Sequence, residues 1–281
     1  MMRSMFSAIS GLKNHQLKMD VIGNNIANVN TYGFKASRVT FKDAFYQTIS
    51  PATGNSGDTG GMNPSQIGLG MSVQSVDTIV EPGGIARTDR PLDFTIEGEG
   101  YFVLRKYDGD DAAGPVYYSR AGNFYLDDQG YLVNADGYYV MGVEGDSEVE
   151  EDPVDLMRIQ IDYEQFTSVK FDKNGVVAGI DVDGARVMIG RMAVATCVNP
   201  SGLNKEGNNL LTESNNSGPM RSAAPGDIGT GTLAPGGLEM SKVDLSQEFT
   251  DMIITQRGFQ ANSRVITVSD TMLEELVNLK R

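Results

Sequence analysis

The sequence has almost none of the residues on which thiol, imidazole and zinc chemistry depend. Its 281 residues include one histidine, His15, one cysteine, Cys197, and no tryptophan. A single cysteine excludes a disulfide bond within the chain, and a single histidine leaves almost no material for a Ser-His-Asp or Cys-His catalytic group or a zinc cluster. We therefore expect no enzymatic activity, no cofactor and no metal. His15 is predicted to lie on a helix surface and Cys197 to be a buried thiol in a strand.

Positive charge and long apolar runs are also scarce. The chain has 23 Lys and Arg against 37 Asp and Glu, so its formal net charge is -14. This charge would repel nucleic acid and anionic lipid, and no stretch is apolar enough to span a membrane. The N-terminal residues do not lead into the apolar stretch of a signal peptide. We expect no nucleic-acid partner, no membrane insertion and, if the protein is secreted, a route other than the general secretory signal.

Apolar residues follow a helical repeat near both ends of the chain. At the N-terminus they form one seam, which comprises Met5, Ile9, Leu12, Met19 and Ile26. At the C-terminus they follow steps of four and three residues, and this seam comprises Leu245, Phe249, Met252, Phe259, Ile266, Leu273 and Val277. The pattern predicts two terminal helices of coiled-coil character.

Each apolar side chain buried in a seam contributes about 1.5–3 kcal/mol, so we expect the seams to be completed by neighbouring copies of the chain. The alternative is that both helices pack onto the protein's own β domain. The run Ser241-Lys242-Val243-Asp244 resembles a capping box at the start of the second helix, which we expect to continue nearly to Arg281.

The middle of the chain has the pattern of an antiparallel β domain. Apolar and polar residues alternate around Phe94, Phe171 and Val194. The 33 glycines and turn sequences such as Asp136-Gly137 and Asn174-Gly175 favour hairpins. Two polar connectors rich in glycine and proline, within 50–70 and 215–237, flank this region.

The predicted fold class is therefore α+β, with paired terminal helices, extended connectors and a central antiparallel β domain. The expected divisions are residues 1–35 (N-terminal assembly helix and the motif described below), 36–87 (N-terminal connector), 88–214 (β domain), 215–240 (C-terminal connector) and 241–281 (C-terminal assembly helix).

Acidic clusters offer the remaining chemistry. The segments 108–111 and 181–184 superficially resemble calcium loops, but neither continues into the spaced ligands of an EF-hand, and hairpin turns explain them better. The acidic segment from Glu144 to Asp155 is interpreted as a solvated loop, with binding of a basic partner as the alternative. A secreted carbohydrate- or calcium-binding β module therefore stays open as a function of another class, and a hydrolase acting through paired carboxylates has less support.

The run GNNIANVNTYGFK at residues 23–35 closely resembles the N-terminal signature of bacterial flagellar rod and hook proteins. The signature residues are Asn24, Asn25, Ala27, Asn28, Asn30, Thr31, Gly33, Phe34 and Lys35. The resemblance continues through 92–102, 120–124 and the final helix. Physically, the motif predicts the end of the first helix, with Gly33 as a left-handed stop.

Two further runs, 63–70 and 255–264, are similar to hook subunits, whereas the chain length is close to that of a distal rod subunit. The resemblance therefore implies a compact hook protein, a flexible joint that transmits motor torque, with a straight distal rod subunit as the near alternative. It also implies a tubular homo-polymer with the terminal helices as an inner coiled-coil layer. The implied partners are other axial proteins, namely the distal rod, the hook cap and the hook–filament junction proteins, and the type III export apparatus. The implied location is the extracellular flagellum, at the hook or basal body.

Overall fold

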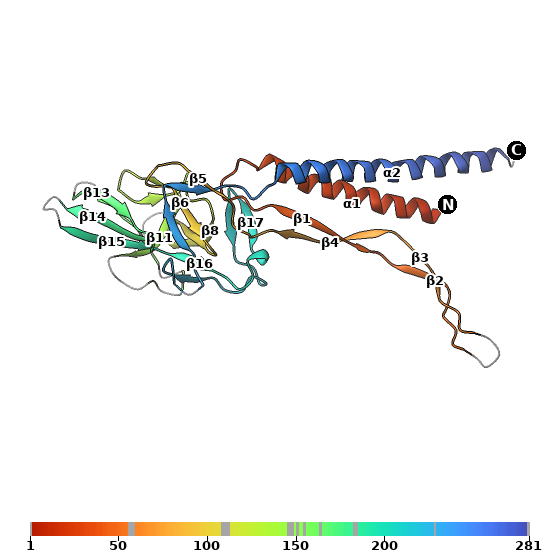
Figure 1. Ribbon diagram of the computed structural model, residues 1–281, viewed down its shortest axis with the longest axis horizontal. Helices are drawn as coiled ribbons and strands as arrows, with labels where there is room; N and C mark the ends of the chain where they lie inside the picture. Colours follow the sequence, from red (N-terminus) through yellow and green to blue (C-terminus); the bar gives the residue numbers. More distant parts are fainter. Residues whose placement is uncertain are drawn as a thin grey trace. The chain divides into compact units, whose positions relative to one another are not determined.

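The computed structural model confirms an α+β fold in which the chain forms two compact units (Figure 1). Unit 1 comprises residues 1–27, 37–79 and 243–281, and unit 2 comprises residues 28–36 and 80–242. The residues that the structure describes are 2–55, 60–107, 113–144, 149, 152–153, 156–162, 165–181, 185–227 and 229–279.

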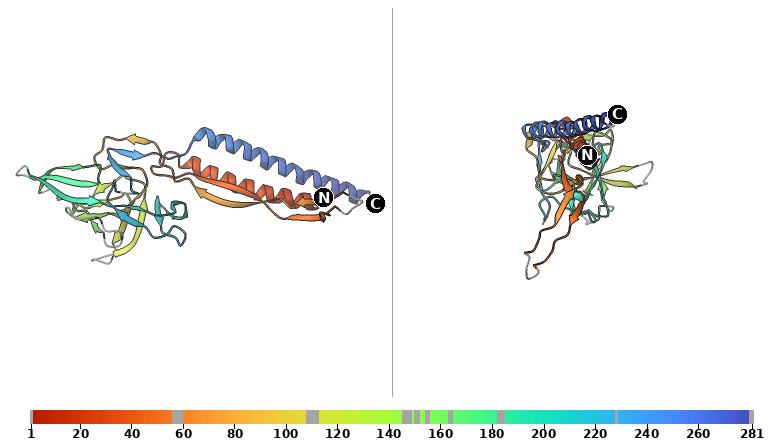
Figure 2. Two further views of the ribbon diagram at one scale, coloured as in Figure 1. Left: turned by 60° about the horizontal axis from the view of Figure 1, so that its bottom comes forward. Right: turned by 90° about the vertical axis from the view of Figure 1, so that its right-hand side faces the viewer.

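Unit 1 contains both helices. Helix α1 spans Met2–Ala27 and helix α2 spans Leu245–Asn278, and the two lie side by side (Figures 1 and 2). The expected capping box at Ser241 is wrong. Instead, the Asp244 carboxylate accepts hydrogen bonds from the backbone N–H groups of Ser246 (2.9 Å) and Gln247 (3.3 Å). Because this carboxylate satisfies the free amides of the first turn, α2 begins directly after Asp244.

Four strands complete unit 1. Strand β1 (Ser37–Asp43) pairs antiparallel with β4 (Met71–Thr78), and β2 (Tyr46–Ser50) forms an antiparallel hairpin with β3 (Ser65–Gly68). The segment 50–70, which was expected to be a linker, therefore contains an ordered strand, β3, and the last residue of β2. An isolated bridge between Thr53 and Met62 extends this hairpin.

Unit 2 is built on an antiparallel sheet of 13 strands, whose main path runs β13-β14-β15-β11-β7-β8-β18-β17. The strands of unit 2 are β5 (Ile85–Arg87), β6 (Phe94–Glu97), β7 (Tyr101–Tyr107), β8 (Ala113–Ser119), β9 (Tyr125–Leu126), β10 (Leu132–Val133), β11 (Tyr139–Glu144), β12 (Met157–Arg158), β13 (Phe166–Phe171), β14 (Val176–Asp181), β15 (Arg186–Met192), β16 (Val194–Thr196), β17 (Asn204–Gly207), β18 (Leu210–Thr212), β19 (Arg221–Ala223), β20 (Thr232–Pro235) and β21 (Gly237–Glu239). A short 3-10 helix, η1, spans Pro200–Gly202.

The core of unit 2 is aromatic. The Phe124 ring meets the Phe102 ring edge to face with a centroid distance of 5.1 Å, and Phe94 meets Phe171 in the same way at 4.8 Å. The predicted hairpin turns are confirmed at Gly137 and Gly175, where φ is 79° and 74°, values that glycine adopts without a steric penalty. The turn expected at 183–184 and most of the acidic segments lie outside the described residues.

The expected C-terminal connector, 215–240, is part of the β structure. Its strands β19, β20 and β21 pair with β16, β6 and β5, respectively. Leu233 and Leu238 are buried in unit 2. The burial of these two leucines explains why the segment joins the β structure although it is rich in glycine and proline.

No helix in the described ranges is long and apolar enough to cross a membrane. The described part of the chain contains no group of three or more His, Cys, Asp or Glu side chains that could hold a metal ion.

Candidate functional site

The two terminal helices pack against each other in antiparallel register. A Cβ atom added at Gly11 would meet the Asn262 side chain at 2.7 Å, and one added at Gly258 would meet the His15 ring at 2.8 Å. Farther along, Lys18 lies 3.5 Å from Asp251. The residue numbers rise on α1 as they fall on α2, so the helices run in opposite directions.

Small residues are prominent among the buried residues of the two helices. The buried residues of α1 are Ala8, Gly11, Ile22 and Asn25, and those of α2 are Thr255 and Ser269. The hydroxyl groups of both α2 residues donate to a carbonyl one turn earlier at 2.7 Å, so neither is left unpaired. Small side chains let the two backbones approach closely.

The predicted seams lie beside this contact instead of forming it. All five seam residues of α1 are half-buried, and Ile9, Leu12 and Ile26 each directly follow a buried residue. On α2, Met252, Phe259, Ile266 and Leu273 are half-buried, whereas Leu245, Phe249 and Val277 are exposed. Large apolar side chains at heptad spacing predicted the helices but not the residues at the centre of their interface.

The sequence predicted that His15 lies on the outer helix surface, but the structure places its side chain against β1 and α2. Its ring is edge to face with the Phe41 ring of β1, with centroids 6.2 Å apart, and lies against Gly258 of α2. Because Gly258 has no side chain, the imidazole can reach the α2 backbone. Burial and the nearby Lys18 ammonium lower the pKa of His15 below its ordinary value of 6.5.

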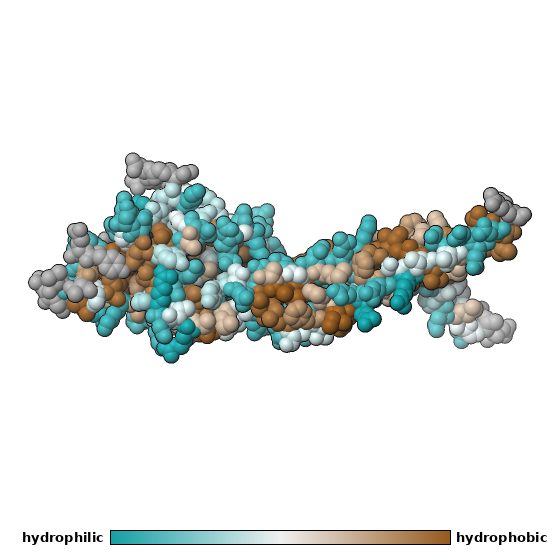
Figure 3. All heavy atoms as spheres, turned by 90° about the horizontal axis from the view of Figure 1, so that it is seen from above, coloured by the Kyte–Doolittle hydropathy of each residue, from teal (hydrophilic) through white to brown (hydrophobic). Residues whose placement is uncertain are grey.

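Sequence reasoning did not find two exposed apolar surfaces of unit 1. The first, which we call the outer stripe, follows one face of α2 and consists of Ile254, Val265, Val268, Met272 and Leu276. Apolar patches on the surface of unit 1 are visible in Figure 3. The steps of three and four residues in this stripe were a signal in the sequence, but the stronger heptad on the adjacent face obscured it.

The second surface is the hairpin β2–β3. Its exposed apolar residues are Phe45, Tyr46, Ile49, Met62 and Ile67, and Phe45 retains 83% of its accessible surface. Exposed apolar residues gathered on one hairpin indicate a candidate site of association. These five residues lie within 36–87, which was expected to be the N-terminal connector.

Asn25 of the signature joins three parts of unit 1. Its side-chain amide donates to the carbonyl of Ser37 at 2.7 Å and to the Glu248 carboxylate at 2.9 Å, and its side-chain oxygen accepts from the N–H of Ser37 at 3.0 Å. A buried amide with all these bonds holds the end of α1 to β1 and to the first turn of α2.

The signature residues from Asn28 onward belong to unit 2. Gly33 has φ of 71°, and its N–H donates to the Glu239 carbonyl at 2.8 Å. It lies six residues beyond the last residue of α1, so it shapes the segment after the helix and is not the helix stop that the sequence predicted. The Thr31 hydroxyl donates to the Asn28 side chain at 3.1 Å, whereas Asn24, Ala27 and Asn30 are exposed.

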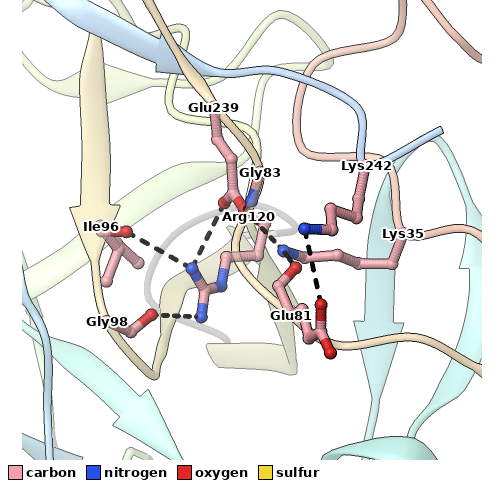
Figure 4. A network of polar contacts seen from close by, with 8 residues as sticks. All are labelled: Lys35, Glu81, Gly83, Ile96, Gly98, Arg120, Glu239 and Lys242. Carbon is pink, nitrogen blue, oxygen red and sulfur yellow. Dashed lines mark hydrogen bonds and ion pairs between the residues drawn. The ribbon is translucent and has the colours of Figure 1, made fainter. Parts of the chain in front are cut away.

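Lys35 of the signature enters a buried ionic cluster, which we call the Glu239 cluster (Figure 4). One Glu239 oxygen accepts from the Lys35 ammonium at 2.6 Å and from the N–H of Gly83 at 2.8 Å, and the other accepts from the Arg120 guanidinium at 3.3 Å. Lys35 also donates to the carbonyl of Glu81 at 2.8 Å.

All three charged side chains of this cluster are at most 8% exposed. Burial lowers the pKa of Lys35, while the bond to Glu239 opposes that shift. The cluster ties the segment 28–36 to β21 and to the loop after β8. Its charged groups bond to one another and to backbone carbonyls, so its geometry indicates a structural clamp.

Comparison with protein families matches three parts of the chain. Residues 5–35 match the family described as flagella basal body rod protein, residues 95–179 match the D1 domain of flagellar hook protein FlgE/F/G, and residues 234–279 match the C-terminal part of the flagellar basal body rod FlgEFG protein. The first and third of these segments carry the two helices, and the second carries much of the β unit.

Individual relatives cover the whole chain. It is 49% identical over its full length to the full-length flagellar basal-body rod protein FlgG of Bacillus subtilis, and 37% identical, over 99% of the chain and all of the relative, to FlgG of Caulobacter vibrioides. It is 30% identical to the flagellar hook protein FlgE of Borreliella burgdorferi, with all of both chains covered in an alignment of 447 positions. The resemblance seen in residues 23–35 is thereby confirmed, and the chain belongs to the family of flagellar rod and hook proteins, the structural subunits of the flagellar axis.

Proposed function

We propose that this chain is a self-assembling subunit of the flagellar basal-body rod. The observation that supports assembly is the pair of exposed apolar surfaces on unit 1, the outer stripe and the hairpin β2–β3. Each apolar side chain that a neighbouring copy covers would contribute about 1.5–3 kcal/mol. Covering several on each copy is sufficient to drive polymerisation without chemistry, so the proposed role is structural and not enzymatic.

The rod assignment is supported by length and identity. The alignment with the rod protein of Bacillus subtilis runs over 282 residues, nearly the 281 of this chain, at 49% identity. The alignment with the hook protein of Borreliella burgdorferi runs over 447 positions at 30% identity. Because the chain has the length of the rod relative, a rod subunit is better supported than the hook subunit that the run 255–264 favoured.

The hook subunit is the second candidate, because the runs 63–70 and 255–264 are similar to hook proteins. In either role, the proposed partners are other copies of the chain and the neighbouring axial proteins, and the proposed place is the hook or basal body of the flagellum. We further propose that the chain reaches that place unfolded through the type III export apparatus. The proposed assembly region comprises the terminal helices with the predicted seams and the outer stripe, together with the hairpin β2–β3.

Electron microscopy of polymer grown from the purified chain tests the assignment. A rod subunit is expected to give straight, stiff tubes, and immunogold labelling of isolated flagella is expected to mark the basal body. Curved tubes and labelling of the hook would favour the hook subunit instead. A chain that stays monomeric at every concentration and labels neither structure would contradict both candidates.

A further inference from the structure

The only histidine of the chain lies where a charge is poorly accommodated. His15 is enclosed by its own helix, by the Phe41 ring of β1 and by the α2 backbone at Gly258. Its Nδ1 atom is buried and has no hydrogen-bond partner among the described residues. A neutral imidazole tolerates this position because Nδ1 can be the unprotonated nitrogen, whereas an imidazolium would carry a buried N–H donor without an acceptor.

The charged groups around the ring do not compensate for a second positive charge. Lys18, one turn along α1, is the cation whose charge acts on the ring, and its ammonium lies 3.5 Å from Asp251 of α2. Glu248 of α2 accepts from the Asn25 amide. On β1, the side chain that faces the imidazole ring is the uncharged Phe41. Asp251 and Glu248 are thus already engaged, and the ammonium of Lys18 would repel an imidazolium.

We infer that His15 makes the pairing of α1 with α2 sensitive to acid, because protonation of its ring places an unsatisfied donor and a second cation inside the interface. The direction of the pH dependence follows from the linkage between proton binding and helix pairing. The pKa of His15 is lowered in the paired state, so the separated helices bind the proton more readily. The contribution of the neutral His15 ring to helix pairing is complete above the ordinary pKa of 6.5. It is lost as the pH falls from there through the lowered pKa of the folded protein. Each pKa unit between the two values weakens pairing about tenfold.

Nuclear magnetic resonance of the full-length protein, without a histidine tag, tests this inference directly. Because the chain has one histidine, a single imidazole Cε1–H signal reports its titration. The midpoint is expected below 6.5 and to shift toward 6.5 in Lys18→Gln, which removes the neighbouring charge. A wild-type midpoint at or above 6.5 would overturn the inference, and so would a midpoint that does not respond to Lys18→Gln.

Thermal melting followed by the helical circular-dichroism signal supplies the second measurement. Between pH 7.5 and 5, the melting temperature of the wild type is expected to fall more than that of His15→Gln, whose side chain stays neutral throughout. Parallel curves for the two proteins would refute an acid-sensitive helix pair. These measurements concern the monomer, so a failure of the proposed rod function would leave their outcome unchanged.

Discussion

At the residue scale, the Glu239 cluster shows how one carboxylate can organise distant parts of a chain. Lys35 and Arg120 lie 204 and 119 residues away from Glu239 in the sequence. Taking one partner out of a buried ionic cluster leaves uncompensated charge, which costs far more than the loss of an exposed pair. The three residues therefore stabilise unit 2 as a set.

Replacing Glu239 with Gln is expected to destabilise unit 2 by about 3–5 kcal/mol, because two buried cations lose their only carboxylate. Urea unfolding followed by circular dichroism in the β region measures this change. Glu81→Gln is the matched control, since its carboxylate is 69% exposed and lies 3.5 Å from the exposed Lys242 ammonium. That control is expected to cost less than about 1 kcal/mol. Equal losses in the two variants would show that the cluster does not clamp unit 2.

The Glu239 cluster could not be predicted from the sequence. Lys35 was identified through its motif, but nothing local marks Glu239 or Arg120 as its partners, because the fold alone brings them together. Asn25 was also identified through the motif. Its bonds to Ser37 and Glu248 could not be predicted without knowing how the two helices pack.

At the element scale, the sequence predicted more. Heptad spacing gave both helices, and alternation with Asn-Gly and Asp-Gly turns gave the β unit. The helix interface was missed because its central positions are small: Gly11 and Gly258 contribute nothing to an apolar pattern, although they decide how closely the helices approach. Half-buried neighbours such as Phe259 and Ile266 produced the recognised seam instead.

Glycine-to-alanine substitutions test this interface. In Gly258→Ala, the new methyl group would meet the His15 ring at 2.8 Å, so repacking offsets the gain in helix propensity. In Gly23→Ala, on an exposed part of α1, nothing lies within 4 Å, and the helix is expected to gain about 0.5–1 kcal/mol.

The stability of Gly258→Ala is therefore expected to lie about 1–3 kcal/mol below that of Gly23→Ala. Thermal unfolding followed by the helical circular-dichroism signal compares the two variants. If Gly258→Ala stabilised the helices as much as Gly23→Ala does, the close approach of α1 to α2 at this position would be disproved.

At the scale of the whole molecule, the surfaces of α2 have separate roles. The inner face meets α1 within the chain, while the residues of the outer stripe keep 42–60% of their accessible surface. A residue on the inner face should therefore be needed for the folded monomer, and one on the outer stripe for the polymer. Charges introduced on each face in turn can distinguish folding from assembly.

The double variant Ile254→Asp, Val268→Asp changes the outer stripe at residues that are 60% and 54% exposed. It is expected to keep the helical content and melting temperature of the wild type but to raise the critical concentration for polymerisation at least tenfold, since each lost apolar contact is worth about 1.5–3 kcal/mol. Sedimentation of polymer across a concentration series measures this critical concentration.

The matched variant Phe259→Asp, Ile266→Asp places the same charges on the half-buried face and is expected to lower the melting temperature of the monomer itself. Normal polymer from the outer-stripe variant would mean that copies associate through other surfaces, with the hairpin β2–β3 the next to be changed.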